Sequence, residues 1–279
     1  MLAKTIRWAS LALIALAGLL ALASQTPEPP LPDGVVKQAA RVLLTGRAVT
    51  VDIYARHGAT NAPVVIVAHG FSRGRRHMAG WGGMLASGGF IAAIPDQPTW
   101  ADASRNGRAL MELLDKIRSG EVALPATANH RAAMVGFSLG GLSTLMAASP
   151  AKADAWVGLD PVDMHGRGRR AGNGNPLPSA ILLAEPAPWN HFGAAHRIIE
   201  SLPNKPFTLR VRGATHCDVE WPTDWLGRSA CGPTDPERRE IFARYTLAFL
   251  RASLLDDTAA VAGLRRAEAD PGVEDVDGP

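Results

Sequence analysis

A serine between two glycines is the most informative chemical feature of the sequence. Residues 136–140 read Gly-Phe-Ser-Leu-Gly, after the apolar run 132–135 and before the helix-compatible run 141–146. In this strand–turn–helix context a serine stands on a tight turn, and a bulky side chain two residues away would collide with the neighbouring strand or helix. The start of the following helix favours negative charge that develops beside it. We predict that Ser138 is a nucleophile; the alternative is an ordinary glycine-rich turn.

Acyl transfer also needs hydrogen-bond donors for the oxyanion that forms during the reaction. We expect one donor to be the backbone N–H of Leu139, which directly follows the serine. The buried strand predicted at 64–68 ends in His69-Gly70, and a sharp turn at Gly70 would direct the Phe71 N–H into the same site. We interpret His69 itself as a structural histidine that ties this loop to its neighbours.

The general base should be a histidine late in the chain. His216 lies four residues past Arg212, where the last strand-like run ends. A histidine in the loop after the last strand can reach a serine on such a turn, whereas the other histidines precede the serine or lie in mid-chain segments. We therefore predict that His216 is the base.

Three carboxylates are candidates for the acid that orients this base. Asp160 ends the strand-like run 155–159, Asp163 follows three residues later, and Glu185 ends the run 180–184. The chain order Ser…Asp/Glu…His holds for all three. The commonest layout takes the acid from the later strand, which favours Glu185, so spacing alone leaves the choice open.

The pattern of apolar runs predicts the elements that position these residues. Short runs rich in Val, Ile and Leu alternate with helix-like stretches, which is typical of an α/β protein with a mostly parallel sheet and helices on both faces. We expect about eight strands and an antiparallel start. The strand-like runs are 40–45, 48–55, 64–68, 90–94, 131–135, 155–159, 180–184 and 207–212. The helix-like stretches include 103–117, 141–148, 189–201 and 236–254.

The motifs resemble those of a known family. Residues 136–141 and 158–163, together with 69–71 and 215–218, are similar to the α/β-hydrolase fold, in its chlorophyllase, platelet-activating-factor-acetylhydrolase and dienelactone-hydrolase-like branch. In the chlorophyllase and acetylhydrolase members the acid is the aspartate that ends the strand after the nucleophile helix. The resemblance therefore implies Asp160 as the acid. Phe137 and Leu139 stand where chlorophyllases usually have histidine and arginine, which argues against a chlorophyll substrate.

Together these residues predict a serine hydrolase that cleaves carboxylic esters through an acyl-enzyme on Ser138. We expect a monomer that needs no metal or organic cofactor and acts on a small-molecule or lipid-like ester. The same three residues could instead run cofactor-free perhydrolysis or acyl transfer to an alcohol. A non-catalytic binding module on the same fold is a third, less favoured hypothesis.

Residues 1–23 have the pattern of a signal peptide. Lys4 and Arg7 precede an apolar run, 9–23, and Ala21-Leu22-Ala23 fits a cleavage site. The alternative is an uncleaved membrane anchor, although the run is short against a span of about 20 residues. We predict cleavage after Ala23 and a secreted or periplasmic protein.

The only two cysteines, Cys217 and Cys231, lie 14 positions apart. An oxidising compartment favours disulfides. We therefore predict that these two cysteines pair. Since Cys217 directly follows His216, the bridge would brace the loop that carries the base.

Composition sets the remaining boundaries. A Pro-rich linker, 24–34, precedes the predicted catalytic domain, 35–254, and an acidic, flexible tail is predicted at 255–279. The net charge is +3, and removing Lys4 and Arg7 leaves 27 basic residues against 26 acidic ones. Without a Lys/Arg-rich run, the chain is not expected to bind nucleic acid. Membrane contact is expected only through residues 1–23, if they are retained.

Two arginine-bearing loops and several tryptophans complete the candidates. The loops could attract an anionic substrate or a lipid headgroup, or be ordinary solvated loops; their arginines are Arg73, Arg75 and Arg76, then Arg167, Arg169 and Arg170. The tryptophans could line an acyl pocket or belong to the core; they are Trp81, Trp100, Trp189, Trp221 and Trp225.

Overall fold

The computed structural model describes residues 26–276, so the predicted signal peptide, residues 1–23, lies outside the described part. Within residues 26–276 nine strands form one sheet, in the order β1-β2-β4-β3-β5-β6-β7-β8-β9. The strands are β1 (Val35–Leu44), β2 (Arg47–Arg56), β3 (Ala62–Ala68), β4 (Ile91–Pro95), β5 (Ala128–Phe137), β6 (Ala155–Leu159), β7 (Ser179–Leu183), β8 (Phe207–Val211) and β9 (Val273–Asp275).

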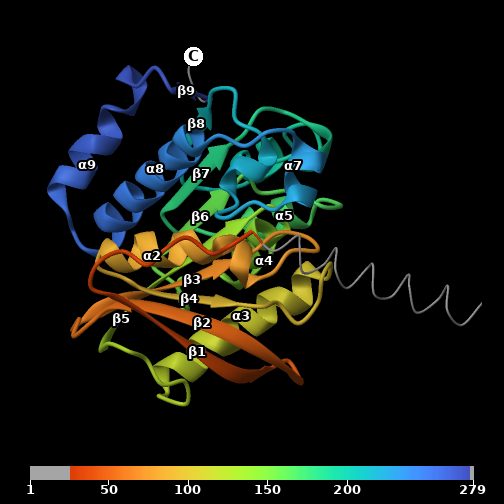
Figure 1. Ribbon diagram of the computed structural model, residues 1–279. Coiled ribbons are helices and arrows are strands. Elements are labelled where there is room, and N and C mark those ends of the chain that lie inside the picture. The colour runs from red at the N-terminus through yellow and green to blue at the C-terminus, as the bar shows by residue number, and fades with distance from the viewer. Residues whose placement is uncertain (1–25, 277–279) are drawn as a thin grey trace, which may run out of the picture.

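Helices connect the strands and cover both faces of the sheet (Figure 1). The α-helices are α2 (Ala79–Ser87), α3 (Ala103–Arg118), α4 (Leu139–Ala147), α5 (Arg167–Gly172), α6 (His196–Ile199), α7 (Trp225–Cys231), α8 (Pro236–Leu254) and α9 (Thr258–Arg265). Short 3-10 segments are η1 (Arg75–Met78), η2 (Pro188–Asn190), η3 (His216–Val219) and η4 (Ala267–Ala269). No helix among residues 26–276 is long and apolar enough to cross a bilayer.

The centre of the sheet is parallel. Neighbouring strands from β4 to β8 run parallel, whereas β1 and β2 at one edge and β9 at the other pair antiparallel. The α/β class, the mostly parallel sheet and the antiparallel start agree with the sequence prediction. The ninth strand was not predicted.

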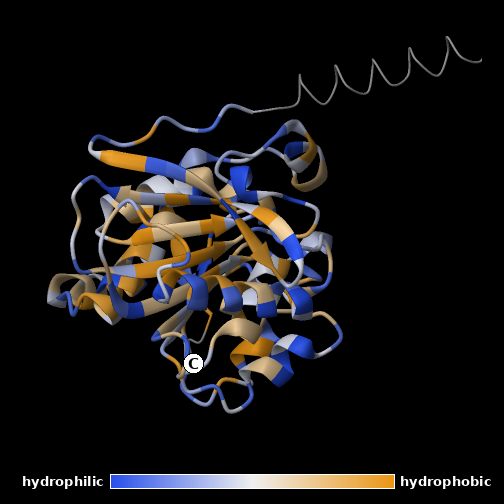
Figure 2. Ribbon diagram, turned by 90° about the horizontal axis from the view of Figure 1, so that it is seen from below, coloured by the Kyte–Doolittle hydropathy of each residue, from blue (hydrophilic) through white to orange (hydrophobic). Residues whose placement is uncertain are grey.

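The side chains of each strand point alternately to the two faces of the sheet, and this divides the core into two layers. On β3, Val65 and Val67 face a cluster that includes Trp81 of α2 and Phe242 of α8. Their neighbours Val64 and Ile66 face a second cluster, with the buried side of α3. Because successive side chains of a strand point to opposite faces, a strand covered on both sides is apolar throughout. Figure 2 shows hydrophobic residues concentrated on the strands of the sheet.

The predicted flexible tail, 255–279, is wrong for the part that the structure describes. Helix α9 packs against α8, and β9 pairs with β8. Val273 and Ala267 are buried in the core, and the Tyr245 hydroxyl donates to Asp270 at 2.8 Å. The acidic composition suggested disorder. Burial of these two apolar residues and the pairing of β9 with the edge of β8 instead hold the segment in place.

Two other expectations also need correction. Residues 26–34 of the predicted linker lie on the body of the protein: Thr26 Oγ1 donates to the Thr223 carbonyl at 3.1 Å, and Glu28 pairs with Lys37 at 2.6 Å. The stretch 189–201 is not one helix, because His191, Phe192 and Gly193 have positive φ and separate η2 from α6. The interruption leaves η2 as a separate turn, and its last residue, Asn190, contacts the candidate acid Asp160.

Candidate active site

Ser138 stands on a strained turn between β5 and α4. Its φ of 54° and ψ of −121° are unusual for a residue other than glycine. A Cβ on Gly136 would lie 2.3 Å from the Gly140 carbonyl oxygen, and one on Gly140 would lie 2.3 Å from the His69 carbonyl oxygen. Only glycine permits this approach, which explains the Gly-x-Ser-x-Gly spacing physically.

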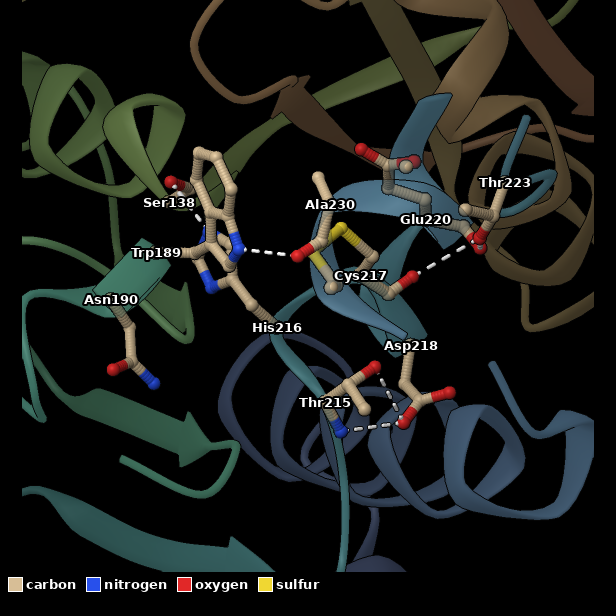
Figure 3. Close-up of a disulfide and its surroundings, with 12 residues drawn as sticks. Ser138, Trp189, Asn190, Thr215, His216, Cys217, Asp218, Glu220, Thr223 and Ala230 are labelled. Atoms are coloured by element: carbon tan, nitrogen blue, oxygen red, sulfur yellow. Dashed lines mark hydrogen bonds between the residues drawn. A yellow bond between two sulfur atoms is a disulfide. The ribbon is translucent and has the colours of Figure 1, made fainter. Parts of the chain in front are cut away.

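A chain of short hydrogen bonds links three side chains that are distant in sequence. The Ser138 hydroxyl and His216 Nε2 are 2.9 Å apart, and His216 Nδ1 lies 2.5 Å from Asp160 Oδ2. With Nδ1 protonated, the ring donates to the carboxylate and accepts from the hydroxyl. All three side chains are buried, and Figure 3 shows Ser138 beside His216. The structure therefore brings together the residues predicted as nucleophile, acid and base.

The Asp160 carboxylate is held from two further directions. Its Oδ1 accepts from the Ala184 N–H at 3.1 Å, and its Oδ2 accepts from Asn190 Nδ2 at 3.0 Å. Asn190 is buried in η2, and its Oδ1 accepts from the N–H groups of Ala187 and Gly193. Sequence reasoning missed Asn190, because nothing local distinguishes it from other turn asparagines.

The two alternative acids have other partners. Glu185 is partly exposed, with Oε1 accepting from the Gly213 N–H at 2.9 Å. Asp163 is buried, with Oδ1 accepting from the Gly168 N–H at 2.7 Å at the start of α5. Among the described residues neither carboxylate hydrogen-bonds to His216.

The two predicted oxyanion donors lie beside the serine. Leu139 is the first residue of α4, and Phe71 follows Gly70, whose Cα faces Ser138 so closely that a Cβ there would lie 3.3 Å from the Ser138 Cβ. Within residues 26–276 neither N–H has a hydrogen-bond acceptor. Both donors are therefore available to an oxygen bound at Ser138.

His69 ties the loop after β3 to the loop after β4. The ring is buried; Nδ1 lies 3.0 Å from the Gly70 carbonyl oxygen, and Nε2 accepts from the Gln97 N–H at 3.1 Å. Burial lowers the pKa of His69 to about 4, so the ring is neutral at physiological pH. Its contacts are those of the structural histidine that we predicted.

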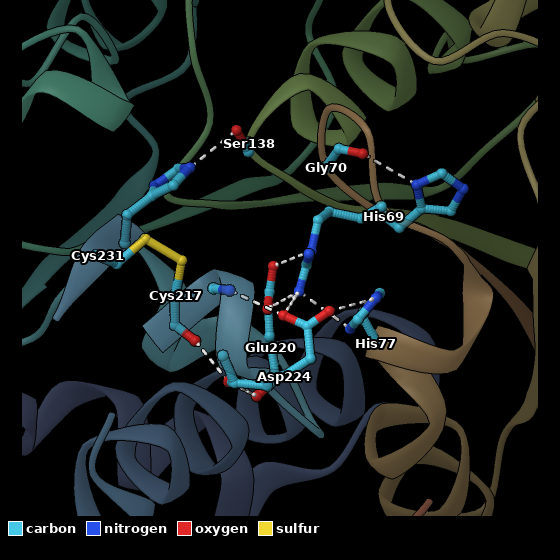
Figure 4. A network of polar contacts seen from close by, with 12 residues as sticks. His69, Gly70, His77, Ser138, Cys217, Glu220, Asp224 and Cys231 are labelled. Atoms are coloured by element: carbon cyan, nitrogen blue, oxygen red, sulfur yellow. Dashed lines mark hydrogen bonds and ion pairs between the residues drawn. A yellow bond between two sulfur atoms is a disulfide. The ribbon is translucent and has the colours of Figure 1, made fainter. Parts of the chain in front are cut away.

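The loop that carries His216 is braced by its neighbours. Asp218 is completely buried; its Oδ2 accepts from the Thr215 N–H at 2.7 Å and its Oδ1 from the Asp235 N–H at 2.6 Å. The predicted disulfide is present, because Cys217 and Cys231 are bonded with their Cα atoms 5.8 Å apart. The bridge joins the base loop to the last residue of α7, and Figure 4 shows both cysteines. The role of Asp218 was not predicted.

A buried ion-pair cluster joins the Phe71 loop to the base loop (Figure 4). Arg73 donates to both carboxylate oxygens of Glu220 at 2.7 Å and to Asp224 Oδ1 at 2.9 Å. Burial raises the pKa of Glu220, and the charge of Arg73 acts in the opposite direction. Arg73 is thus a structural cross-link between the two loops and not a solvated loop residue.

An apolar pocket of about 500 Å³ opens at Ser138. Besides Ser138 and His216, its walls include Phe71, Phe137, Leu139, Val162, Met164 and Trp189. Trp189 crosses to α7, where its Nε1 donates to the Ala230 carbonyl at 2.6 Å. Of the five tryptophans considered from sequence, Trp189 lines this pocket, whereas Trp81 is buried in the core.

Comparison with protein-family models finds no match, and comparison with curated proteins finds none either. Within residues 26–276 no group of three or more His, Cys, Asp and Glu side chains is arranged to hold a metal ion.

The neutral state of His69 predicts a pH dependence of stability. Its folded pKa of about 4 lies below the usual 6.5, so its contribution is complete above pH 6.5 and is lost as the pH falls towards 4. The full contribution is about 3 kcal/mol. Urea unfolding across this pH range should show a shallower loss of stability in His69→Gln than in the wild type. His57→Gln, at an exposed position, is the control; equal slopes in all three proteins would contradict the assignment.

The disulfide predicts a second stability effect. Replacing both cysteines (Cys217→Ser with Cys231→Ser) should cost about 3 kcal/mol by the chain-entropy model, because the unfolded chain loses a constraint. Thermal unfolding measures the loss, and hydrogen exchange should accelerate first in α7. The control is alkylation of the unreduced native protein with a thiol reagent, and labelling of both cysteines there would exclude the bridge.

Proposed function

We propose that this protein is a serine hydrolase with the α/β-hydrolase fold that cleaves carboxylic esters. The observation that carries the proposal is the unbroken hydrogen-bond chain from the Ser138 hydroxyl through His216 to Asp160, at the mouth of an apolar pocket. The turn that raises the serine at the end of a central strand, and the chain order Ser…Asp…His, support the proposed fold.

In the proposed first step, Ser138 Oγ attacks the ester carbonyl carbon while His216 Nε2 takes the hydroxyl proton. The N–H groups of Phe71 and Leu139 donate to the resulting oxyanion. The bond to the alcohol oxygen then breaks, and the imidazolium returns its proton to the leaving alcohol. The product of this half-reaction is an acyl-enzyme on Ser138.

In the second half, water takes the place of the alcohol. His216 removes a proton from the water, which attacks the acyl carbonyl, and the acid leaves as Ser138 recovers its proton. Asp160 keeps Nδ1 protonated and stabilises the positive charge that His216 carries in both halves. Asn190 and the Ala184 N–H hold that carboxylate in position.

The pocket supports an ester with an apolar acyl or alcohol group. Its walls near the serine are aromatic and aliphatic, and the charged side chains at its edge, Arg73 and Glu220, neutralise each other. Burial of apolar substrate surface supplies binding energy here without a specific polar contact.

The nucleophile can be tested chemically. Wild-type protein should react with a fluorophosphonate probe at Ser138 and hydrolyse p-nitrophenyl esters, and Ser138→Ala should lower kcat by about 10⁶-fold. Mass spectrometry locates the probe, and thermal unfolding confirms that the variant is folded. If Ser138 of folded wild-type protein does not react with the probe, the proposed enzyme is excluded and the hypothesis of a non-catalytic binding module is favoured. Product analysis with added peroxide or alcohol separates hydrolysis from the two related transfers.

The acid can be tested with a matched pair of variants. Asp160→Asn should lower kcat by about 10⁴-fold, because the amide no longer orients the imidazole or stabilises its charge. Glu185→Gln changes a partly exposed carboxylate in the neighbouring loop that has no hydrogen bond to His216, and it should leave kcat within about threefold. The opposite ranking in steady-state assays would assign the acid to Glu185.

A further inference from the structure

Five exposed aromatic side chains and one exposed leucine gather around the mouth of the pocket. The described residues include nine large hydrophobic side chains that are exposed, and six of them form this group, each 51–72% exposed. We call these six the aromatic rim: Phe71, Trp100, Trp189, Phe192, Trp225 and Leu226. Such contiguous exposure is uncommon on a monomer and marks an interaction surface.

Contacts show that the rim is one surface. Phe71, Trp189 and Leu226 line the pocket at Ser138. The ring of Trp100 lies 5.5 Å from that of Phe71, and Trp225 precedes Leu226 on α7.

The remaining member, Phe192, lines an adjoining pocket of about 430 Å³. Met164, Pro188 and His191 are common to both pockets, so Phe192 lies next to the pocket at Ser138.

Four arginines lie beside the rim without acidic partners. Arg197 lines the pocket of Phe192, and Arg167, Arg169 and Arg170 are exposed on α5, which packs against α6. None of the four forms an ion pair with a residue in 26–276. Asp163, the acidic residue in this pocket wall, is buried against the Gly168 N–H. The face is therefore positively charged as well as aromatic.

The start of the described chain lies at the same face. Thr26 donates to the carbonyl of Thr223, the residue before the N-cap of α7. Residues 9–23, apolar except for Ser10, thus precede a point next to the rim. Figure 1 shows α5 and α7 on the same side of the molecule.

We propose that the aromatic rim and the four arginines dock on an anionic lipid surface, with the mouth of the pocket against the lipid. Aromatic side chains suit the boundary between water and acyl chains, and arginines bind anionic headgroups. Ester substrates then reach Ser138 from the lipid phase. That last consequence rests on the proposed function, whereas docking does not. The surface adds a membrane contact that does not depend on residues 1–23, which are expected to contact a membrane only if they are retained.

Docking can be measured without catalysis. The full chain carries Ser138→Ala to prevent hydrolysis and Trp8→Phe to remove the tryptophan of the N-terminal segment. Vesicles of phosphatidylcholine with brominated acyl chains, with or without phosphatidylglycerol, quench tryptophans that enter the lipid. We expect quenching on the anionic vesicles, much less on neutral ones, and reversal by salt. Esterase assays of the wild type test the proposed function separately.

Variants assign the binding to the face. Phe192→Ser with Leu226→Ser should abolish quenching, and changing the four arginines to glutamine should weaken binding by roughly fivefold per charge. Leu43→Ser, at an exposed position on β1, and Arg265→Gln with Arg266→Gln, at the end of α9, are the controls and should bind as before.

Four results would overturn the proposal. Equal quenching on neutral and anionic vesicles would remove the role of the arginines, and absence of quenching on both would remove the docking. Self-association in ultracentrifugation that Phe192→Ser abolishes would assign the rim to a second copy of the chain. Vesicle association without quenching, through retained residues 1–23 alone, would also count against docking.

Discussion

One imidazole must meet two side chains that are far from it in sequence. His216 lies between Ser138 and Asp160, at 2.9 and 2.5 Å, and small shifts of any of the three loops would break one of these bonds. Each loop begins at the carboxyl end of a parallel strand, where neighbouring strands bring distant segments to one edge. The regular spacing of β5, β6, β7 and β8 is therefore the constraint on which the site depends.

Buried residues around Asp160 and His216 hold these two side chains in the orientation that their hydrogen bonds require. Asn190 holds the Asp160 carboxylate, Asp218 holds the turn of His216, and the ring of Phe137 lies 4.7 Å from the imidazole. Each of these groups is buried and has its own partners. A side chain fixed in this way loses little further entropy when a reaction or a ligand requires one orientation.

An ion pair and a disulfide hold the loops that form the walls of the pocket. The Arg73–Glu220 pair joins the Phe71 loop to the base loop, and the Cys217–Cys231 bridge joins the base loop to α7. Both links join residues that are in direct contact but belong to different segments of the chain. The rim side chains around the pocket stay exposed although these links hold the loops that carry them.

Local sequence was sufficient where local sterics decide the structure. The glycines at 136 and 140, the apolar runs of the parallel strands and the single possible cysteine pair predicted the serine turn, the sheet and the disulfide. The carboxylate that meets His216 was left open among three by spacing, and only the resemblance favoured Asp160. Tertiary structure alone decided which of them points to the imidazole, the contact of Asn190 with Asp160, and the packing of α9 and β9. Those outcomes depend on contacts between segments tens of residues apart, and no local pattern encodes such contacts.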